Sequence, residues 1–303
     1  MSQLDQPLKA LGFMLAAQAC FSLNILLLRV SERAESLGSG LSFHLRPWEP
    51  MLYRSVAMVA WCCFCLWRRP GDTLDQREKI WLLSRGGAGV MSLSAYYYGV
   101  LHIPLGMASL FSNSSPLYVA LLATLVGGEK LTRSRYGSLV FGFAGISLVG
   151  LGATQGALSI RSLDLLIAAL SGPLSAMAYF SIRQLKRIRN EQIMLSLGLG
   201  GALLSLLMIS AQGFRLPSQP LAHVWLLVSV PPALFAQEFL TRAFRCAPAS
   251  QVAPLQYTGP LFSLLLAWWV LGEMIPTISL LGMGLVLIFC MLIPYLELRF
   301  TSK

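Results

Sequence analysis

Hydroxyl and amide side chains recur at helical spacing inside an apolar run at residues 103–126. Ser109, Ser112, Asn113 and Pro116 occupy positions i, i+3, i+4 and i+7, which a helix places on one face. A buried polar group without a partner is costly, so this face must point into a helical bundle or a wet cavity. Its chemistry is hydrogen bonding, either to a bound solute or to a neighbouring helix.

A second apolar run repeats this spacing, with Ala253, Gln256, Tyr257 and Pro260 in the corresponding positions. A proline inside a helix frees the carbonyl of the preceding turn and lets the helix bend. We therefore expect Pro260 and its counterpart Pro116 to bend their helices beside a binding site.

Two further apolar runs carry polar residues four apart on one face. The first has Gln18 and Ser22, and the second has Ser171, Ser175 and Tyr179. We expect these groups to line the same cavity, where hydroxyls close to an aromatic face suit a flat or amphipathic organic solute.

Three consecutive aromatic residues, Tyr96, Tyr97 and Tyr98, sweep about 200° around a helix, so at least one points inward. Such rings bind flat solutes by stacking and positive ones by cation–π contact. We include Tyr97 and Tyr98 among the cavity residues without deciding which of the three faces inward. An interfacial aromatic belt explains the same residues equally well, because they lie towards the outer end of their run.

Few ionisable residues fall inside the apolar runs. Arg54 is placed to attract an anionic group such as a substrate carboxylate, and snorkelling or a structural ion pair explains it equally well. Arg85 is interpreted as an anchor that extends to the inner surface. Glu238 and Arg242 lie four residues apart, which indicates a local ion pair or an inner gate rather than a proton site.

Enzymatic and metal chemistry has no support in the motifs. The histidines His44, His102 and His223 lie at the outer ends of predicted helices, and no HExxH or GxSxG motif is present. The six cysteines lie in or against apolar runs, and none has metal-ligand spacing to a histidine. We therefore expect no catalytic residue, no metal and no cofactor.

The composition determines the elements that must hold these residues. Of 303 residues, 55% are hydrophobic and 12% are charged, about half the usual charged share. A soluble domain needs more charge, so the chain is predicted to be an all-α integral membrane protein. A window of about 19 residues gives ten transmembrane helices, near 10–29, 49–68, 80–101, 103–126, 135–153, 162–182, 191–211, 222–244, 247–271 and 277–295.

Lys and Arg fall mainly in alternate connecting segments. With the N-terminus inside, the inner segments hold 16 of them and the outer segments 5. This bias predicts that both termini are cytoplasmic. The net charge of +10 is therefore a signal of topology and of contact with anionic lipids, and it does not indicate nucleic-acid binding.

An internal repeat divides the chain. Residues 104–129 match residues 248–273 at nine of 26 positions without a gap. The chain thus consists of two five-helix halves, 1–153 and 154–303. Because five is odd, the second half enters the membrane from the opposite side, and such inverted repeats are typical of secondary transporters.

The repeated segments resemble a known family. The stretch FAQEFLTRAFRCAPASQVAPLQYTGPLFSLLLAWWVLGE at 235–273 and the stretch MLYRSVAMVAW at 51–61 are similar to the EamA repeat of the drug/metabolite transporter superfamily. The resemblance implies two inverted five-helix EamA repeats, a cavity near mid-membrane and alternating access, in a multi-pass protein of a cell membrane, most simply a bacterial inner membrane.

Members of this family export amino acids and drugs or move riboflavin, S-adenosylmethionine or sugar-nucleotides, so the resemblance does not determine the substrate. We expect an exporter of small organic metabolites such as amino acids. The alternative is a carrier of the same fold that imports a larger metabolite such as riboflavin or S-adenosylmethionine. The expected partners are a small-molecule solute and membrane lipids, without nucleic acid, and the protein is expected to be a monomer or homodimer.

The distribution of acidic residues predicts how transport is driven. No acidic residue falls at the predicted mid-depth of a helix, where ion-driven carriers commonly have one. We therefore expect weak or absent ion coupling, as in a uniporter that runs down the gradient of its solute. Glu129 and Glu273 close two of the apolar runs and are predicted to cap helices or to pair with loops.

Overall fold

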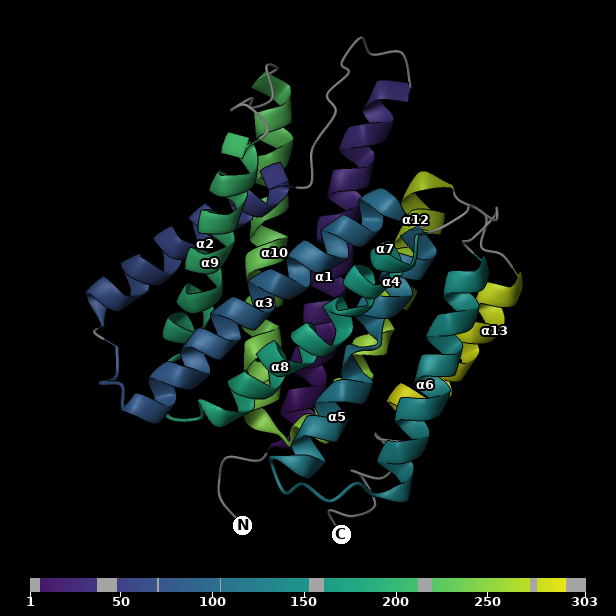
Figure 1. The fold of residues 1–303 in the computed structure, drawn as a ribbon. Coiled ribbons are helices and arrows are strands. Elements are labelled where there is room, and N and C mark those ends of the chain that lie inside the picture. The colour runs from purple at the N-terminus through teal and green to yellow at the C-terminus, as the bar shows by residue number, and fades with distance from the viewer. Residues whose placement is uncertain are drawn as a thin grey trace.

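The structure is a computed structural model that describes residues 6–36, 48–69, 71–103, 105–152, 161–211, 220–272 and 277–292. All regular structure in these ranges is helical (Figure 1). In chain order the elements are α1 (Pro7–Ser36), α2 (Trp48–Arg68), α3 (Gln76–His102), α4 (Leu105–Asn113), α5 (Ser115–Leu125), α6 (Arg133–Gly152), α7 (Ser162–Ala169), α8 (Ser171–Gln184), α9 (Asn190–Ala211), α10 (Pro220–Cys246), α11 (Ala249–Val252), the 3-10 helix η1 (Ala253–Tyr257), α12 (Thr258–Leu271), α13 (Thr277–Val286) and the π-helix η2 (Leu287–Leu292).

Every predicted span coincides with a helical stretch of the described chain. Some stretches are continuous, and others, such as α4 with α5 or α11 with η1 and α12, consist of shorter helices in series. Within the described ranges, five stretches combine the length and the apolar character that crossing a membrane requires, namely Pro7–Leu28, Trp48–Arg68, Ser162–Gln184, Asn190–Ala211 and Ala222–Cys246. The protein is thus an all-helical, multi-pass membrane protein.

The most extensive helix contacts join the two halves of the chain. Helix α1 packs mainly on α10, α2 on α9, α3 on α8, and α6 on α13. In Figure 1 the α2–α9 and α6–α13 pairs lie at opposite sides of the molecule. In the repeat, α1 corresponds to α8, α3 to α10 and α5 to α12. Replacing each helix by its counterpart converts the α1–α10 contact into α8–α3 and the α1–α12 contact into α8–α5, and both contacts are present. Packing therefore follows the sequence repeat.

Two of the interrupted stretches break at repeat-related prolines. Helix α4 ends at Asn113 and α5 begins at Ser115, just before Pro116. In the second half, α11 ends at Val252, η1 follows from Ala253 to Tyr257, and α12 begins at Thr258, just before Pro260.

The repeat also explains two glycines. Gly128 and Gly272 have φ of 65° and 64°, a left-handed conformation that glycine adopts at low cost. Gly272 is the C-cap of α12. Both halves therefore have glycine at this position because the backbone there adopts a left-handed conformation.

Close packing of α3 on α9 depends on small residues. A Cβ atom at Gly86 would lie 2.7 Å from the carbonyl oxygen of Ser196, and one at Gly89 would lie 2.7 Å from Cδ1 of Leu197. A side chain at either position would push the helices apart. These contacts fix the face of α3 that points into the molecule.

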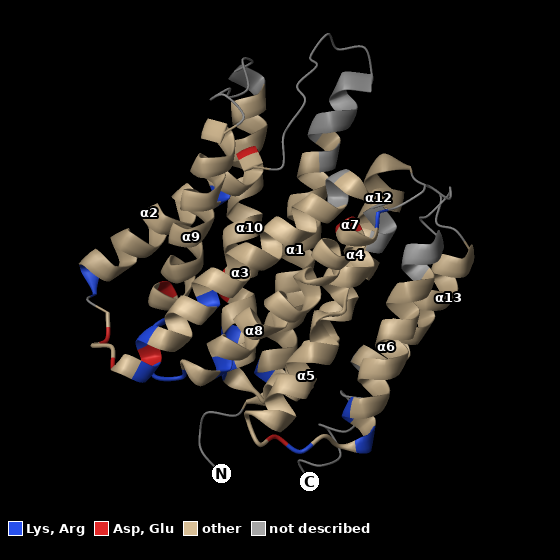
Figure 2. Ribbon diagram, in the orientation of Figure 1, with Lys and Arg blue, Asp and Glu red and all other residues tan. Residues whose placement is uncertain are grey.

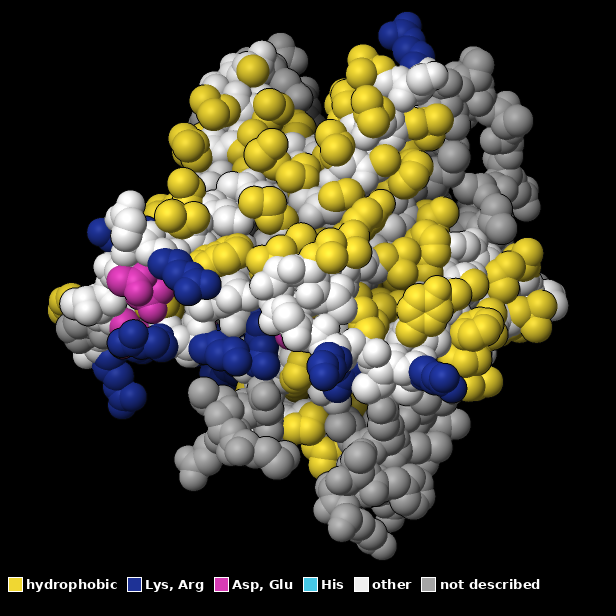
Figure 3. All heavy atoms as spheres, turned by 60° about the horizontal axis from the view of Figure 1, so that its bottom comes forward, with side chains coloured by type: hydrophobic (Ala, Val, Ile, Leu, Met, Phe, Trp, Pro, Cys, Tyr) yellow, Lys and Arg dark blue, Asp and Glu magenta, His cyan; other side chains and the backbone are white. Residues whose placement is uncertain are grey.

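The charged residues gather at one end of the bundle, where α2 and α10 finish and α6 begins (Figure 2). Figure 3 shows this face with Lys and Arg side chains over it and apolar side chains around it. We call this surface the basic end, defined by Arg68, Lys79, Arg133, Arg183, Lys186, Arg189, Arg242 and Arg245. The helix sides expose large apolar residues such as Trp67, Leu83 and Trp269, as contact with lipid requires.

Candidate functional site

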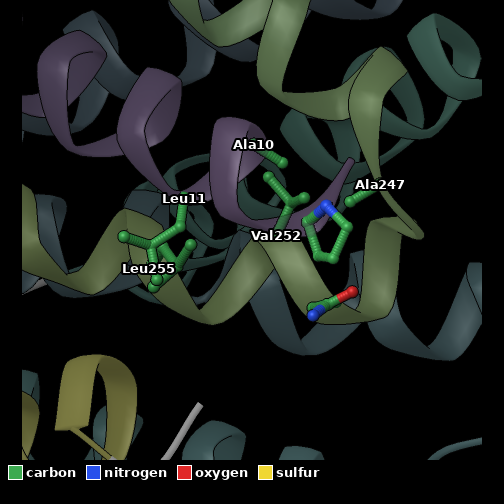
Figure 4. A pocket seen from close by; sticks show the side chains of 7 residues that line it. Ala10, Leu11, Ala247, Val252 and Leu255 are labelled. Atoms are coloured by element: carbon green, nitrogen blue, oxygen red, sulfur yellow. The ribbon is translucent and has the colours of Figure 1, made fainter. Parts of the chain in front are cut away.

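Two hollows in the described part of the molecule are candidates for a site. The smaller lies where the start of α1 meets α11 and η1, with Ala10, Leu11, Ala247, Val252 and Leu255 among its lining residues (Figure 4). Its volume of about 10 Å³ has room for about one water molecule. Because no charged residue lines it, it offers little chemistry for recognising a solute.

The larger cavity, of about 110 Å³, lies between the two halves of the chain. Its walls come from α1, α2, α3, α4, α8, α9 and α10. The polar residues that line it are Arg54, Arg85, Ser92, Tyr96, Ser112, Ser175, Tyr179 and Gln237. This cavity is the candidate site.

Arg85 is the most deeply buried charge on the wall. Its side chain is only 2% exposed, its guanidinium lies 5.9 Å from the ring centre of Tyr179, and its Nε has no hydrogen-bond partner. The interpretation of Arg85 as an anchor reaching the inner surface is therefore wrong. Gly89, one turn further along α3, leaves the space into which the guanidinium folds, since a Cβ there would lie 3.2 Å from Arg85 Nη1.

Arg54 of α2 lines the same cavity and is half-buried. Its Nε is also buried without a partner. Arg54 and Arg85 therefore carry like charges on the wall of one cavity. Among the described residues, no carboxylate forms an ion pair with either arginine.

Hydroxyl, aromatic and amide groups complete the wall. Ser92 Oγ lies 2.5 Å from Ser175 Oγ and donates to the carbonyl of Ser171 at 2.9 Å, which ties α3 to α8. Tyr179 stacks on Phe244 with ring centres 5.4 Å apart. Gln237 is 4% exposed and its Nε2 has no partner. The site thus offers hydrogen-bond donors in a confined space between the helices.

The model of the EamA-like transporter family matches residues 8–151 and again residues 162–295. The chain belongs to this family. It is therefore a membrane transporter of a small-molecule solute and not an enzyme.

Relatives of this EamA protein include transporters with named substrates. The pseudopaline exporter CntI of Pseudomonas aeruginosa is 27% identical over 279 residues, which are 92% of this chain and 94% of the relative. An uncharacterized transporter of Helicobacter pylori is 26% identical over 80% of this chain and 84% of its own length. A riboflavin transporter of Rhizobium johnstonii is 26% identical over 73% of this chain and 72% of its own length.

A solved protein structure has the same fold. It superposes with a TM-score of 0.74 at 18% identity and covers 95% of this chain and 99% of the other. At this identity the likeness concerns the fold alone.

The structure of this EamA transporter brings four of the residues selected from the sequence together on the cavity wall, namely Arg54, Ser112, Ser175 and Tyr179. They come from α2, α4 and α8. Arg54 has none of the structural ion pairs that were its alternative explanation, as far as the described residues show.

Gln18 and Ser22 lie away from the cavity, contrary to expectation. Ser22 Oγ donates to the carbonyl of Gly259 at 3.0 Å and accepts from Ser263 Oγ at 3.0 Å. Gln18 Nε2 points to the sulfur of Met14 at 3.4 Å. These contacts turn the polar face of α1 towards α12, so that Phe21 faces the cavity instead.

Of the three tyrosines, the one that lines the cavity is Tyr96 and not Tyr97 or Tyr98. Tyr97 packs edge-on against Trp48, with ring centres 5.8 Å apart. Tyr98 donates to Asp164 Oδ1 at 2.9 Å and stacks on His102.

A stripe on α3 was the signal that the sequence interpretation missed. Arg85, Gly89, Ser92 and Tyr96 occupy positions i, i+4, i+7 and i+11, which is one helix face, and all four line the cavity.

The other members of the two proline-containing stripes also lie off the wall. Ser109 and Asn113 are half-buried outside the lining. Tyr257 is fully buried and packs against α6 and η2. The contact with α6 is close, since a Cβ added at Gly142 of α6 would lie 2.6 Å from the Tyr257 ring. Gln256 is 8% exposed, with Nε2 unpartnered. A 3-10 helix has 3.0 residues per turn, so η1 redirects these side chains away from the face that an α-helix gives them.

At the basic end the predicted local ion pair is present. Arg242 Nε donates to Glu238 Oε1 at 2.6 Å, and Asn190 Nδ2 donates to the same oxygen at 3.0 Å. Arg245 donates to the carbonyl of Lys186 at 2.7 Å. These bonds join the end of α10 to the start of α9.

Glu129 acts as a helix cap, as its position predicts. Its carboxylate accepts the backbone N–H groups of Ala249 and Ser250, both at 3.0 Å, and the Ser250 hydroxyl at 2.7 Å. It thereby ties the segment after α5 to the start of α11. The repeat-related Glu273 lies outside the described residues.

Proposed function

We propose that this EamA transporter exports small organic metabolites by alternating access, through ten spans arranged as two inverted five-helix repeats, 1–153 and 154–303. The observation that carries the proposal is the polar cavity between the two halves, with walls from seven helices. A site between inverted repeats is accessible from either side as one half rocks against the other.

Three observations support the inverted repeat. The family model matches the chain twice, at residues 8–151 and 162–295. Helix contacts exchange correctly between the halves, as α1–α10 and α3–α8 illustrate. Gly128 and Gly272 share one left-handed conformation at equivalent positions.

Direction and orientation rest on separate arguments. Lys and Arg side chains gather at the basic end (Figure 2), and such charge is retained on the cytoplasmic side, so we place this end and both termini in the cytoplasm. Export is inferred from the relative named as a pseudopaline exporter, which matches over 92% of this chain. The membrane is then a bacterial inner membrane.

Counterflow in proteoliposomes tests the carrier mechanism. Vesicles loaded with a metabolite should take up a labelled form of it faster than empty vesicles, with saturable kinetics, across a panel of amino acids, nucleosides and organic acids. Ser112→Phe, which fills the cavity, should remove most of this flux, while Leu207→Phe on an exposed helix side should preserve it. Flux that is unsaturable and indifferent to loading would contradict a carrier.

Import of a larger aromatic metabolite is the second candidate. The observations that favour it are the rings of Tyr96 and Tyr179 on the cavity wall and the similarity to a riboflavin transporter. Riboflavin belongs in the same counterflow panel, and uptake of riboflavin without flux of smaller solutes would select this candidate.

A further inference from the structure

We propose that the cavity holds its solute through a carboxylate or phosphate group clamped by Arg54 and Arg85, so that the transported metabolite is an organic anion. This inference rests on the proposed function, because it assigns a substrate class to the same cavity.

The first argument is uncompensated charge. Two guanidinium groups line one cavity of about 110 Å³. Arg85 is 2% exposed, and no carboxylate among the described residues forms an ion pair with it. A buried positive charge without a counter-ion is strongly unfavourable. An anion entering the cavity removes this cost for both arginines at once.

The second argument is the kind of hydrogen-bonding group left free. Three atoms of the cavity-lining residues are buried without a partner, namely Arg54 Nε, Arg85 Nε and Gln237 Nε2. All three are donors, so the complementary ligand is rich in acceptors. Carboxylate and phosphate oxygens are acceptors, and the planar fork of arginine binds them in a bidentate manner.

The third argument concerns the aromatic wall. A ring face lined by hydroxyls would also suit a cation, but Arg85 already occupies the face of Tyr179 at 5.9 Å. A positively charged solute would meet both arginines. The wall therefore excludes cations such as S-adenosylmethionine and favours solutes of the opposite sign.

Thermal unfolding of the purified full-length protein measures binding without requiring transport. The probes are succinate, citrate and glycerol 3-phosphate, each compared with a neutral counterpart, succinamide or glycerol, and with NaCl at matched ionic strength. We expect at least one anion to raise the unfolding midpoint in a saturable manner and the neutral compounds and NaCl to leave it unchanged. Stabilisation by the carboxylates or by the phosphate tells which group is recognised.

Arginine variants identify the clamp. Arg85→Met and Arg54→Met should each weaken anion binding by about 10-fold to 100-fold, the range for hydrogen bonds to charged groups. The apo midpoint of Arg85→Met should not fall, because the substitution removes an uncompensated buried charge. Arg242→Met at the basic end is the matched control and should bind like the wild type.

Three results would overturn the proposal: no saturable stabilisation by any of the anions, equal stabilisation by NaCl, or unchanged affinity in a folded arginine variant. The half-buried position of Arg54 supplies a second variant if Arg85→Met fails to fold. A counterflow assay that finds saturable flux of neutral solutes only would leave the carrier proposal intact and reject the anion. Anion binding without any carrier flux would leave the anion site intact and reject the carrier proposal.

Discussion

Arginines occupy two contrasting regions of this transporter. At the basic end, Arg242 meets Glu238 at 2.6 Å, Arg245 donates to a backbone carbonyl at 2.7 Å, and Arg183 donates to another at 3.1 Å. In the cavity, Arg54 and Arg85 have no hydrogen bond or carboxylate partner among the described residues. The same side chain is thus structural where its donors are satisfied and available to a ligand where they are not.

Burial sharpens this contrast. The Arg242 side chain is 48% exposed, so water solvates the charge and the ion pair contributes little. Arg85 is 2% exposed and can be solvated only by what enters the cavity. The four predictions that follow test the contrast in order of decreasing effect.

The largest effect is expected at the two cavity arginines. Arg85→Met should lower the transport efficiency of an anionic solute by about 10-fold to 100-fold, and Arg85→Lys should have an intermediate effect because it keeps the charge but loses the fork. If both arginines hold one group, the double variant with Arg54→Met should be less impaired than the product of the single effects. Independent, multiplicative losses in flux would show that the two arginines do not share a ligand.

Glu129 tests whether polar groups with satisfied hydrogen bonds contribute to stability and not to binding. Glu129→Ala removes the acceptor of two backbone amides at the start of α11, and the free energy of unfolding should fall by about 1–2 kcal/mol, as for other lost helix caps. Denaturant titration in mixed micelles measures it, with the exposed Lys79→Ala as control. Anion affinity should not change. A variant that is as stable as the wild type but has an altered affinity would show that Glu129 contributes to the binding site.

Variants of two glutamines with unpartnered side-chain amides distinguish the cavity wall from the packed interior. Gln237→Leu should lower anion affinity by a few-fold, since a neutral hydrogen bond contributes about 0.5–1.5 kcal/mol. Gln256→Leu makes the same change in η1, off the wall, and should leave affinity unchanged. Equal effects on affinity would mean that the cavity extends beyond the residues assigned to it.

The smallest effect is expected for Glu238→Gln. An exposed pair four residues apart contributes about 0.3–0.5 kcal/mol, so thermal stability should barely change. Transport should also persist, because we expect no ion coupling. Solute accumulation driven by an imposed pH gradient and lost in Glu238→Gln would refute this expectation.

The helices and the repeat could be predicted because they depend on local patterns. Apolar runs predict the helical stretches, and the pairing of Gly128 with Gly272 follows from an alignment without gaps. The placement of Ser175 and Tyr179 on the cavity wall agrees with their helical stripe, whereas Ser112 lines the wall without the rest of its stripe.

Other positions depend on information that periodicity lacks. A helical stripe shows which residues share a face but not which neighbour covers it. The polar face of α1 turns to α12, where Ser22 donates to the carbonyl of Gly259, 237 positions further along the chain. The switch from α-helix to 3-10 helix at Ala253 changes the period itself, so the face of Tyr257 could not be read from spacing.

The cap formed by Glu129 has a consequence for how the protein tolerates mutation. Its principal partners are the amide groups of Ala249 and Ser250, and every residue except proline carries such a group. A small substitution such as Ser250→Ala therefore keeps both amide bonds and loses the hydroxyl contacts with Glu129 and Arg135. Larger side chains have no room at either position, because both residues are fully buried. This contact between the two halves thus depends on the side chain of Glu129 and on the backbone of its partners.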